Sequence, residues 1–262
     1  MIIKSIAIGS FDGIHIAHKE LIKRADGVLV IEKGFASLTP GYKRAFYTNK
    51  PTSFYLFDEI KKLSPKEFID KLKNEFPKLD KIIVGYDFVF GKNRSGNSQT
   101  LKELFKSVEI VPEVKIENIS VHSRVIREAL NNSDIKLANK LLGRNYKIDG
   151  FHIKGQGLGS KELVPTINLQ TYNYTLPHGV FAIKAYINDT PYNAVCFIGH
   201  RNTVDKSFAL EVHILEKFNE NIKGNVWVEF ISFIRKNQKF SNLKELKEQI
   251  FKDIEIAREV LL

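Results

Sequence analysis

Two histidines near the start of the chain have a spacing that suits the binding of an anion. His15 and His18 follow an apolar run that ends at Gly9, and the turn that joins the run to the histidines contains Asp12 and Gly13. A strand that passes through a glycine turn into a helix directs backbone N–H groups and the helix dipole toward an anion. Because they are three residues apart, the two imidazoles share one helix face and could hold a triphosphate.

Two other interpretations of this histidine pair stay open at this point. His-x-x-His can also bind zinc, but no cysteine lies near the pair to complete a zinc set. The pair could equally be two surface histidines of an ordinary helix. That interpretation is weaker because a strand, a glycine turn and an aspartate precede the pair.

A second candidate site follows the glycine-rich segment 155–159. Pro165 leads into a predicted strand on which Thr166 and Asn168 are two residues apart, so both point to one face. Two neutral oxygens on one face suit a hard cation that bridges nucleotide phosphates. From spacing alone, however, an ordinary polar strand face is the favoured interpretation.

Glu211 and His213 form a similar pair further along the chain. They alternate with apolar residues in a strand pattern, which places both on one face. A single glutamate on a strand usually faces solvent.

Strand and helix patterns alternate in the first half, which predicts an α/β fold with a parallel sheet flanked by helices. The sequence Ser64-Pro65-x-Glu67 is a helix start with a capping box. The predicted strands are residues 2–8, 28–32 and 81–85, and the predicted helices are residues 15–25 and the segment after Ser64.

The pattern changes after two predicted helices at residues 123–131 and 134–142, the second of which Gly143 can cap. Strand patterns then recur without a long helix, which predicts a small antiparallel β-barrel or sandwich, and an amphipathic helix follows Ser241. We therefore expect two domains, residues 1–143 and 144–262. The predicted barrel strands are residues 166–169, 180–187, 193–198, 209–215 and 225–234.

Composition limits the class of protein. The chain has 262 residues, 43% of them hydrophobic, with a formal net charge of +10 and one cysteine, Cys196. The length suits two modest domains, and the lone cysteine, in an apolar stretch, is expected to be a buried thiol. No apolar run approaches the roughly 20 residues that span a bilayer. We expect a cytoplasmic protein with no membrane partner, and the sequence leaves the oligomeric state open.

The first motif resembles the nucleotidyltransferase signature of bacterial FAD synthetases, Gly-x-Phe-Asp-Gly-x-His-x-Gly-His. The chain departs from the signature at Ala17, where the family has glycine. In this resemblance His15 and His18 are catalytic, and the remaining matched residues bind the nucleotide. Those residues are Gly9, Phe11, Asp12 and Gly13.

Two further segments resemble the same family in the same order. The segment 85–96 is similar to a stretch that helps form the flavin and nucleotide pocket, and residues 121–127 are similar to a phosphate-binding helix start. His122 and Arg124 replace a serine and a threonine of the family pattern. The resemblance assigns cofactor binding to Asp87, Phe88, Phe90, Gly91, Arg94, Ser123 and Arg124, and a catalytic role to Arg127.

The second half resembles riboflavin kinases, through their glycine loop, their Pro-Thr-Ala-Asn signature and their Leu-Glu-x-His-x-Leu segment. In this resemblance Thr166 and Asn168 hold Mg²⁺ with the nucleotide, and Glu211 is the general base for the riboflavin 5′-hydroxyl. The resemblance assigns ATP or flavin binding to Gly155, Gly159, Pro165 and Arg235.

Together these resemblances run through nearly the whole chain and identify it as a member of the bacterial bifunctional riboflavin kinase/FAD synthetase family. They imply Mg²⁺ as cofactor, ATP and flavins as partners, and two reactions: riboflavin to FMN, and FMN to FAD. Two alternatives stay open. One is a riboflavin kinase with a degenerate adenylyltransferase domain, which the departures at Ala17, His122 and Arg124 motivate. The other is a nucleic-acid binder that senses flavins or nucleotides, which the net charge of +10 motivates.

Overall fold

The computed structural model describes residues 2–34, 37–154, 163–200 and 208–261. The chain divides into two compact units, Met1–Val125 and Ile126–Leu262, here called unit 1 and unit 2. The boundary predicted at residue 143 stays a prediction. The division between the units falls inside helix α5 (Ser123–Asn131), and helix α6 (Ile135–Leu142) lies between that point and residue 143. None of the helices in the described ranges is long and apolar enough to cross a membrane.

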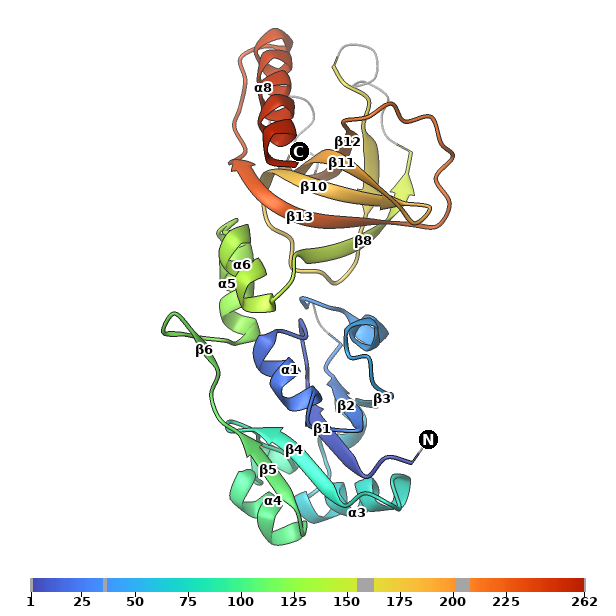
Figure 1. Ribbon diagram of the computed structural model, residues 1–262, viewed down its shortest axis with the longest axis vertical. Helices are drawn as coiled ribbons and strands as arrows, with labels where there is room; N and C mark the ends of the chain where they lie inside the picture. Colours follow the sequence, from blue (N-terminus) through green and yellow to red (C-terminus); the bar gives the residue numbers. More distant parts are fainter. Residues whose placement is uncertain (1, 35–36, 155–162, 201–207, 262) are drawn as a thin grey trace. The chain divides into compact units, whose positions relative to one another are not determined.

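Unit 1 contains a five-stranded parallel sheet in the order β3-β2-β1-β4-β5 (Figure 1). The predicted parallel sheet with flanking helices is therefore confirmed. Strand β1 lies at its centre, and the chain continues from it to β2 on one side and later to β4 on the other. The strands are β1 (Ser5–Gly9), β2 (Gly27–Glu32), β3 (Thr52–Leu56), β4 (Lys81–Gly85) and β5 (Val108–Val111).

The two faces of this sheet bury alternate residues of the same strands. Ala7 and Ile83 pack with helix α1 (Ile16–Ile22), whereas Ile6 and Ile82 face the helices on the other side. This alternation is the period of two that a strand buried on both faces requires. The helices on the second face are α2 (Phe57–Ile60), α3 (Pro65–Glu75) and α4 (Ser98–Leu104).

Local signals account for where several elements begin. The capping box predicted at Ser64 is present: the Ser64 hydroxyl accepts from the N–H of Glu67, and the Glu67 carboxylate accepts from the N–H of Ser64. Between the larger elements lie the 3₁₀ helices η1 (Gly41–Tyr47) and η2 (Lys92–Arg94) and the short hairpin of β6 (Lys115–Ile116) and β7 (Ile119–Ser120).

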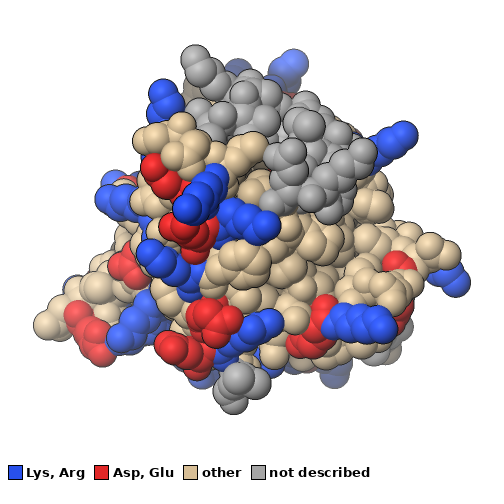
Figure 2. All heavy atoms as spheres, turned by 90° about the horizontal axis from the view of Figure 1, so that it is seen from above, with Lys and Arg blue, Asp and Glu red and all other residues tan. Residues whose placement is uncertain are grey.

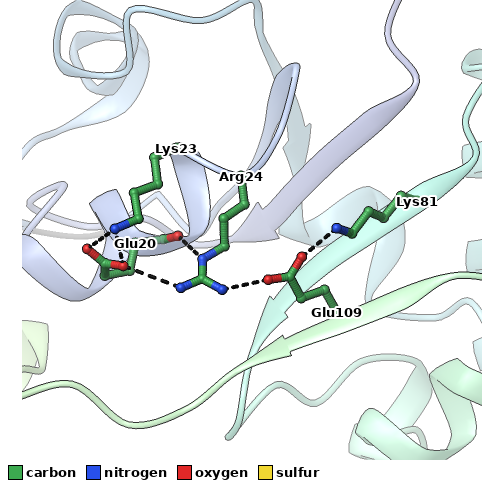
Figure 3. Close-up of polar contacts among 5 residues, drawn as sticks. All are labelled: Glu20, Lys23, Arg24, Lys81 and Glu109. Atoms are coloured by element: carbon green, nitrogen blue, oxygen red, sulfur yellow. Dashed lines mark hydrogen bonds and ion pairs between the residues drawn. The ribbon is translucent and has the colours of Figure 1, made fainter.

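A chain of ion pairs joins α1 to the edge strand β5 and its neighbour β4 (Figure 3). Arg24 bridges Glu20 on α1, at 3.5 Å, and Glu109 on β5, at 2.6 Å. Lys81 on β4 contacts the other oxygen of Glu109 at 2.5 Å, and Lys23 contacts Glu20 at 2.5 Å. These pairs lie near the amino ends of β4 and β5 and link α1 to the edge strand β5.

Unit 2 is a closed six-stranded antiparallel barrel in the order β10-β11-β12-β9-β8-β13, with the C-terminal helix α8 (Leu243–Leu261) beside it (Figure 1). The predicted barrel and helix are confirmed. Helix α8 packs against β10, β11 and β13. The strands are β8 (Tyr146–Ile153), β9 (Ile167–Gln170), β10 (Gly179–Ile187), β11 (Thr190–His200), β12 (Phe208–Ile214) and β13 (Asn225–Arg235).

The core of the barrel includes Cys196, whose side chain is fully buried. Burial raises the pKa of its thiol, so the thiol is protonated and inert. The expectation of a structural, buried cysteine is confirmed.

Candidate functional sites in the two units

A large cavity lies at the carboxyl ends of β1 and β4 in unit 1. Its volume is about 1030 Å³, and its lining includes Gly9, at the end of β1, and Gly85, at the end of β4. The chain order reverses between these two strands, and ligands of open parallel sheets bind at such a switch point. The glycine motif and the segment after β4, both predicted to bind nucleotide or flavin, meet at this cavity.

His15 and His18 lie together in the wall of this cavity. His15 is the N-cap of α1, and its Nδ1 accepts the backbone N–H of His18 at 3.3 Å. The two imidazole rings stack with their centroids 3.5 Å apart, and the His18 ring meets the edge of Phe11. Since His15 is only 3% exposed, its ring is fixed before any ligand arrives.

The turn that carries these histidines has an uncommon backbone. Phe11 and Ile14 have φ of 49° and 41°, a region that favours glycine, and Gly13 has φ of 88°. Phe11 and Ile14 are fully buried, so packing holds them in this conformation. Asp12, predicted to bind the nucleotide, accepts N–H groups of the loop at residues 38 and 39, at 2.8 and 3.2 Å. Its carboxylate therefore attaches the glycine turn to this loop.

The segment after β4 combines core packing with cavity lining. Phe88 and Phe90 stack with centroids 5.5 Å apart, and Phe90 pairs with Gly96 through two 2.9 Å hydrogen bonds. Gly91 has φ of 74°, and a side chain there would meet the Pro65 ring at 2.8 Å. Asp87 and Arg94, both exposed, line the cavity with these aromatics.

The start of α5 connects directly to the glycine turn. The Ser123 hydroxyl donates to the backbone carbonyl of Asp12 at 2.7 Å, so the two phosphate-binding segments of the resemblance are adjacent. Arg124 is exposed and lines the cavity. Arg127 lies one turn further along α5, in unit 2, and its catalytic role stays a prediction.

In unit 2, strands β9 and β12 bring Asn168 directly opposite Glu211. Their neighbours Ile167 and Val212 are buried, so the alternation of a strand puts Asn168 and Glu211 on the outward face. Residues opposite each other in an antiparallel pair have Cβ atoms about 4.5–5.5 Å apart. An amide oxygen and a carboxylate that are 43 residues apart in sequence thus share one small area.

Thr166 lies immediately before β9, where the Pro165 carbonyl is 2.8 Å from Nδ1 of His213. The predicted set of Thr166, Asn168 and Glu211 is therefore held on two adjacent strands. Gly155 and Gly159, predicted to bind ATP, lie outside the described residues.

Arg235, predicted to bind the flavin or nucleotide, is engaged with helix α8. Its Nε and Nη2 donate to the Asp253 carboxylate at 2.7–3.0 Å, and the Asp253 side chain is only 4% exposed. The guanidinium also lies over the Phe240 ring at 5.7 Å. Arg235 thus attaches α8 to the last barrel strand.

Comparisons with known proteins match both units. Residues 142–261 match the riboflavin kinase family model, and residues 52–125 match the FAD synthetase model. The Bacillus subtilis bifunctional riboflavin kinase/FMN adenylyltransferase is 30% identical over 95% of this chain and 89% of its own length. The protein of the same name from Buchnera aphidicola subsp. Acyrthosiphon pisum is 32% identical, over 97% of this chain and 92% of its own length. The chain belongs to this bifunctional family.

The fold is shared with a solved structure, and a third relative has the same name as the first two. A solved Streptococcus pneumoniae structure described as a macrolide-efflux protein superposes with a TM-score of 0.87 at 26% identity, over 98% of this chain and 94% of its own. The Haemophilus influenzae family member, 30% identical over 97% of this chain and 93% of its own length, is again a bifunctional riboflavin kinase/FMN adenylyltransferase.

The structure adds cationic residues that the motifs of this family did not predict. The cavity of unit 1 is also lined by Lys33, which follows β2, by Lys61 and Lys62, which follow α2, and by Lys92. Lys33 could have been found from sequence, since residues just after a parallel strand lie at the ligand-binding edge.

A polar cluster in the same wall was also missed. The Tyr86 hydroxyl lies 3.1 Å from Nε2 of His122 and 3.4 Å from Glu113, which also accepts from Ser120 at 2.5 Å. Partial burial and the Glu113 carboxylate raise the pKa of the Tyr86 hydroxyl, which therefore stays protonated. His122 is one of the departures from the family pattern, and its contact with Tyr86 gives it a defined place in the cavity wall.

The donor atoms fit a hard cation better than a transition metal. Within the described ranges, no group of three or more His, Cys, Asp or Glu side chains could hold a metal ion. Thr166 and Asn168 instead offer neutral oxygens beside the Glu211 carboxylate, a set that suits Mg²⁺ bound mainly by nucleotide phosphates and water.

Proposed function

We propose that this chain phosphorylates riboflavin to FMN in unit 2 and adenylylates FMN to FAD at the cavity of unit 1, each time with ATP. The observation that carries the proposal is that bifunctional relatives match 95–97% of the chain while each unit has a site suited to one of the two reactions. Both reactions consume ATP, so a cytoplasmic location is part of the proposal.

In unit 2, Glu211 accepts the proton of the riboflavin 5′-hydroxyl. The 5′-oxygen then bonds to the γ-phosphorus, the bond from that phosphorus to the β–γ bridging oxygen breaks, and ADP leaves. Thr166 and Asn168 would hold Mg²⁺, which neutralises phosphate charge when it is bound. Because Asn168 is the cross-strand partner of Glu211, the base and the nucleotide-holding oxygens are aligned before the substrates bind.

In unit 1, an FMN phosphate oxygen attacks the α-phosphorus of ATP, and pyrophosphate leaves. The nucleophile is already ionised, so no protein base is needed. His15 and His18 contact the phosphates, and the cations of the cavity wall stabilise the charge of the transition state. Those cations are Lys33, Lys61, Lys62, Lys92, Arg94 and Arg124.

The cations that line the cavity of unit 1 suit small anionic ligands. On the face drawn in Figure 2, Lys and Arg are interspersed with Asp and Glu, and no single basic patch covers that face. We therefore propose flavins and ATP as the partners. Salt-dependent binding of DNA or RNA by the purified protein would contradict this part of the proposal.

The test is a time course of riboflavin with Mg-ATP and purified protein, with products separated by chromatography. FMN should appear first and FAD should follow. A second reaction, started with FMN and ATP, should give FAD and pyrophosphate in equal amounts. If FMN forms in the first reaction but neither reaction gives FAD, the chain is a riboflavin kinase alone, the alternative that His122 and Arg124 motivate.

A further inference from the structure

The entry into strand β9 is held by a side chain of the neighbouring strand. Strand β9 begins at Ile167, and its backbone pairs with β12 are Ile167 with Val212 and Asn168 with Glu211. Thr166 lies one residue before this ladder. At that point Nδ1 of His213, on β12, lies 2.8 Å from the carbonyl oxygen of Pro165.

This contact fixes the role of Nδ1 of His213. A carbonyl oxygen can only accept, so Nδ1 carries the hydrogen and donates it. Continuing the β9–β12 register by one residue places His213 opposite Thr166, as Glu211 is opposite Asn168. The hydrogen bond thus extends the pairing of β9 and β12 by one residue, through the His213 side chain instead of the backbone.

We propose that His213 is a positioning residue of the kinase site, which holds Thr166 in register with Asn168 and Glu211 through its hydrogen bond to Pro165. The inference rests on the proposed kinase function of unit 2. Pro165 has a fixed φ and no N–H of its own, so its carbonyl is the backbone group by which β12 can hold it. Without this hydrogen bond the Thr166 hydroxyl would be less well positioned. ATP binding would then weaken, while Glu211, the proposed base, would stay in place.

Three substitutions separate this role from simple packing. His213→Leu removes the donor at similar volume. His213→Asn keeps an N–H donor at nearly the position of Nδ1, and His213→Gln moves the donor one bond further away. Each variant is assayed for riboflavin phosphorylation. Amide protection of β10, in the same barrel, reports whether unit 2 of each variant is folded.

For Leu and Gln we expect kcat/KM for ATP to fall about 10- to 100-fold, mainly through KM, as for a small misplacement of a binding group. KM for riboflavin should stay unchanged. In His213→Asn, kcat/KM for ATP should stay close to the wild-type value. Amide hydrogen exchange of the segment 164–169 should accelerate in Leu and Gln but not in Asn, with β10 as the unchanged control strand.

Equal kinase kinetics in His213→Leu and wild type would overturn the inference, and so would equal defects in Leu and Asn. Unchanged amide exchange at residues 164–169 in all three variants would overturn it as well, whether or not the wild type is active. Wild-type protein that forms no FMN would overturn the proposed kinase function, which separates that failure from failure of the inference.

Discussion

The cavity of unit 1 and the outward face of β9 and β12 in unit 2 differ in the charge that they present. The cavity combines two stacked histidines and several Lys and Arg side chains with two acids, Asp87 and Glu113. The face in unit 2 centres on one carboxylate, Glu211, opposite the Asn168 amide. A phosphate nucleophile is already charged and needs cations around it, whereas an alcohol must lose a proton and needs a base. The difference between the two sites therefore follows from their nucleophiles, although both would use ATP.

The sharpest way to break this comparison is to remove the base. In Glu211→Gln, FMN formation should fall by about 10²- to 10⁴-fold, the range for loss of a general base, because the amide cannot accept the 5′-hydroxyl proton. FAD formation from added FMN should be unchanged. Rates of both reactions in one preparation provide the measurement. If both activities disappear in folded protein, the assignment of the two reactions to separate sites is wrong.

The reciprocal change is His15→Asn. Asparagine keeps an oxygen that can cap α1 but removes the imidazole from the cavity. FAD formation should fall by about 10²- to 10³-fold, as when one charge-stabilising donor is lost, and FMN formation should stay at the wild-type rate. His15→Ala is the matched control, since it removes both the cap and the ring. An FAD-forming rate in the Asn variant close to that of wild type would show that the ring is structural.

The ion pair that attaches helix α8 to the barrel can be tested separately from the chemistry of unit 2. Asp253→Leu leaves the Arg235 guanidinium without its partner under α8, so the free energy of unfolding of unit 2 should fall by about 3 kcal/mol, as for a broken buried ion pair. The double variant Arg235→Met/Asp253→Leu should recover most of this loss. Denaturant unfolding provides the measurement. Equal losses in the single and double variants would mean that the pair adds nothing beyond packing.

The smallest effect is expected at the ion pairs of unit 1. Hydrogen bonds from Lys81 and then Arg24 hold the pKa of the Glu109 carboxyl below its usual 4.5. A folded-state pKa below the unfolded value stabilises the fold above the unfolded pKa, and the contribution disappears as the pH falls through the folded value. Glu109→Gln should therefore lower Tm slightly at pH 7 and leave it unchanged in strong acid. A Tm difference that persists in acid would point to packing instead.

Sequence patterns predicted the central strands and the helix start at Ser64, because those signals are local. They missed β3 and β5, which lie at the edges of the sheet. They also missed β8, which contains two residues that argue against a strand. Asp149 is buried there because Tyr174 and Asn225 donate to it, and Gly150 lies where a side chain would meet the Gln170 carbonyl at 2.9 Å. Both reasons depend on residues distant in sequence.

The candidate sites show the same limit. The spacing of Thr166 and Asn168 predicted a shared face, but the register that brings Glu211 opposite Asn168 is a property of the closed barrel. The helix predicted after Ser241 begins at Leu243, which is 45% exposed, and contains Asp253, which is buried. An apolar period cannot predict a buried aspartate whose partner, Arg235, lies on the preceding strand.

The buried thiol of Cys196 provides a built-in reporter. Only the thiolate reacts with thiol reagents, and in the closed barrel this sulfur is shielded and its pKa is raised by burial. Since it is the chain's one cysteine, any covalent label marks a single event, the opening of strand β11. The labelling rate of the unaltered protein would therefore report how often the barrel opens locally. The same measurement with ATP or flavin bound would show how far the ligand slows this opening.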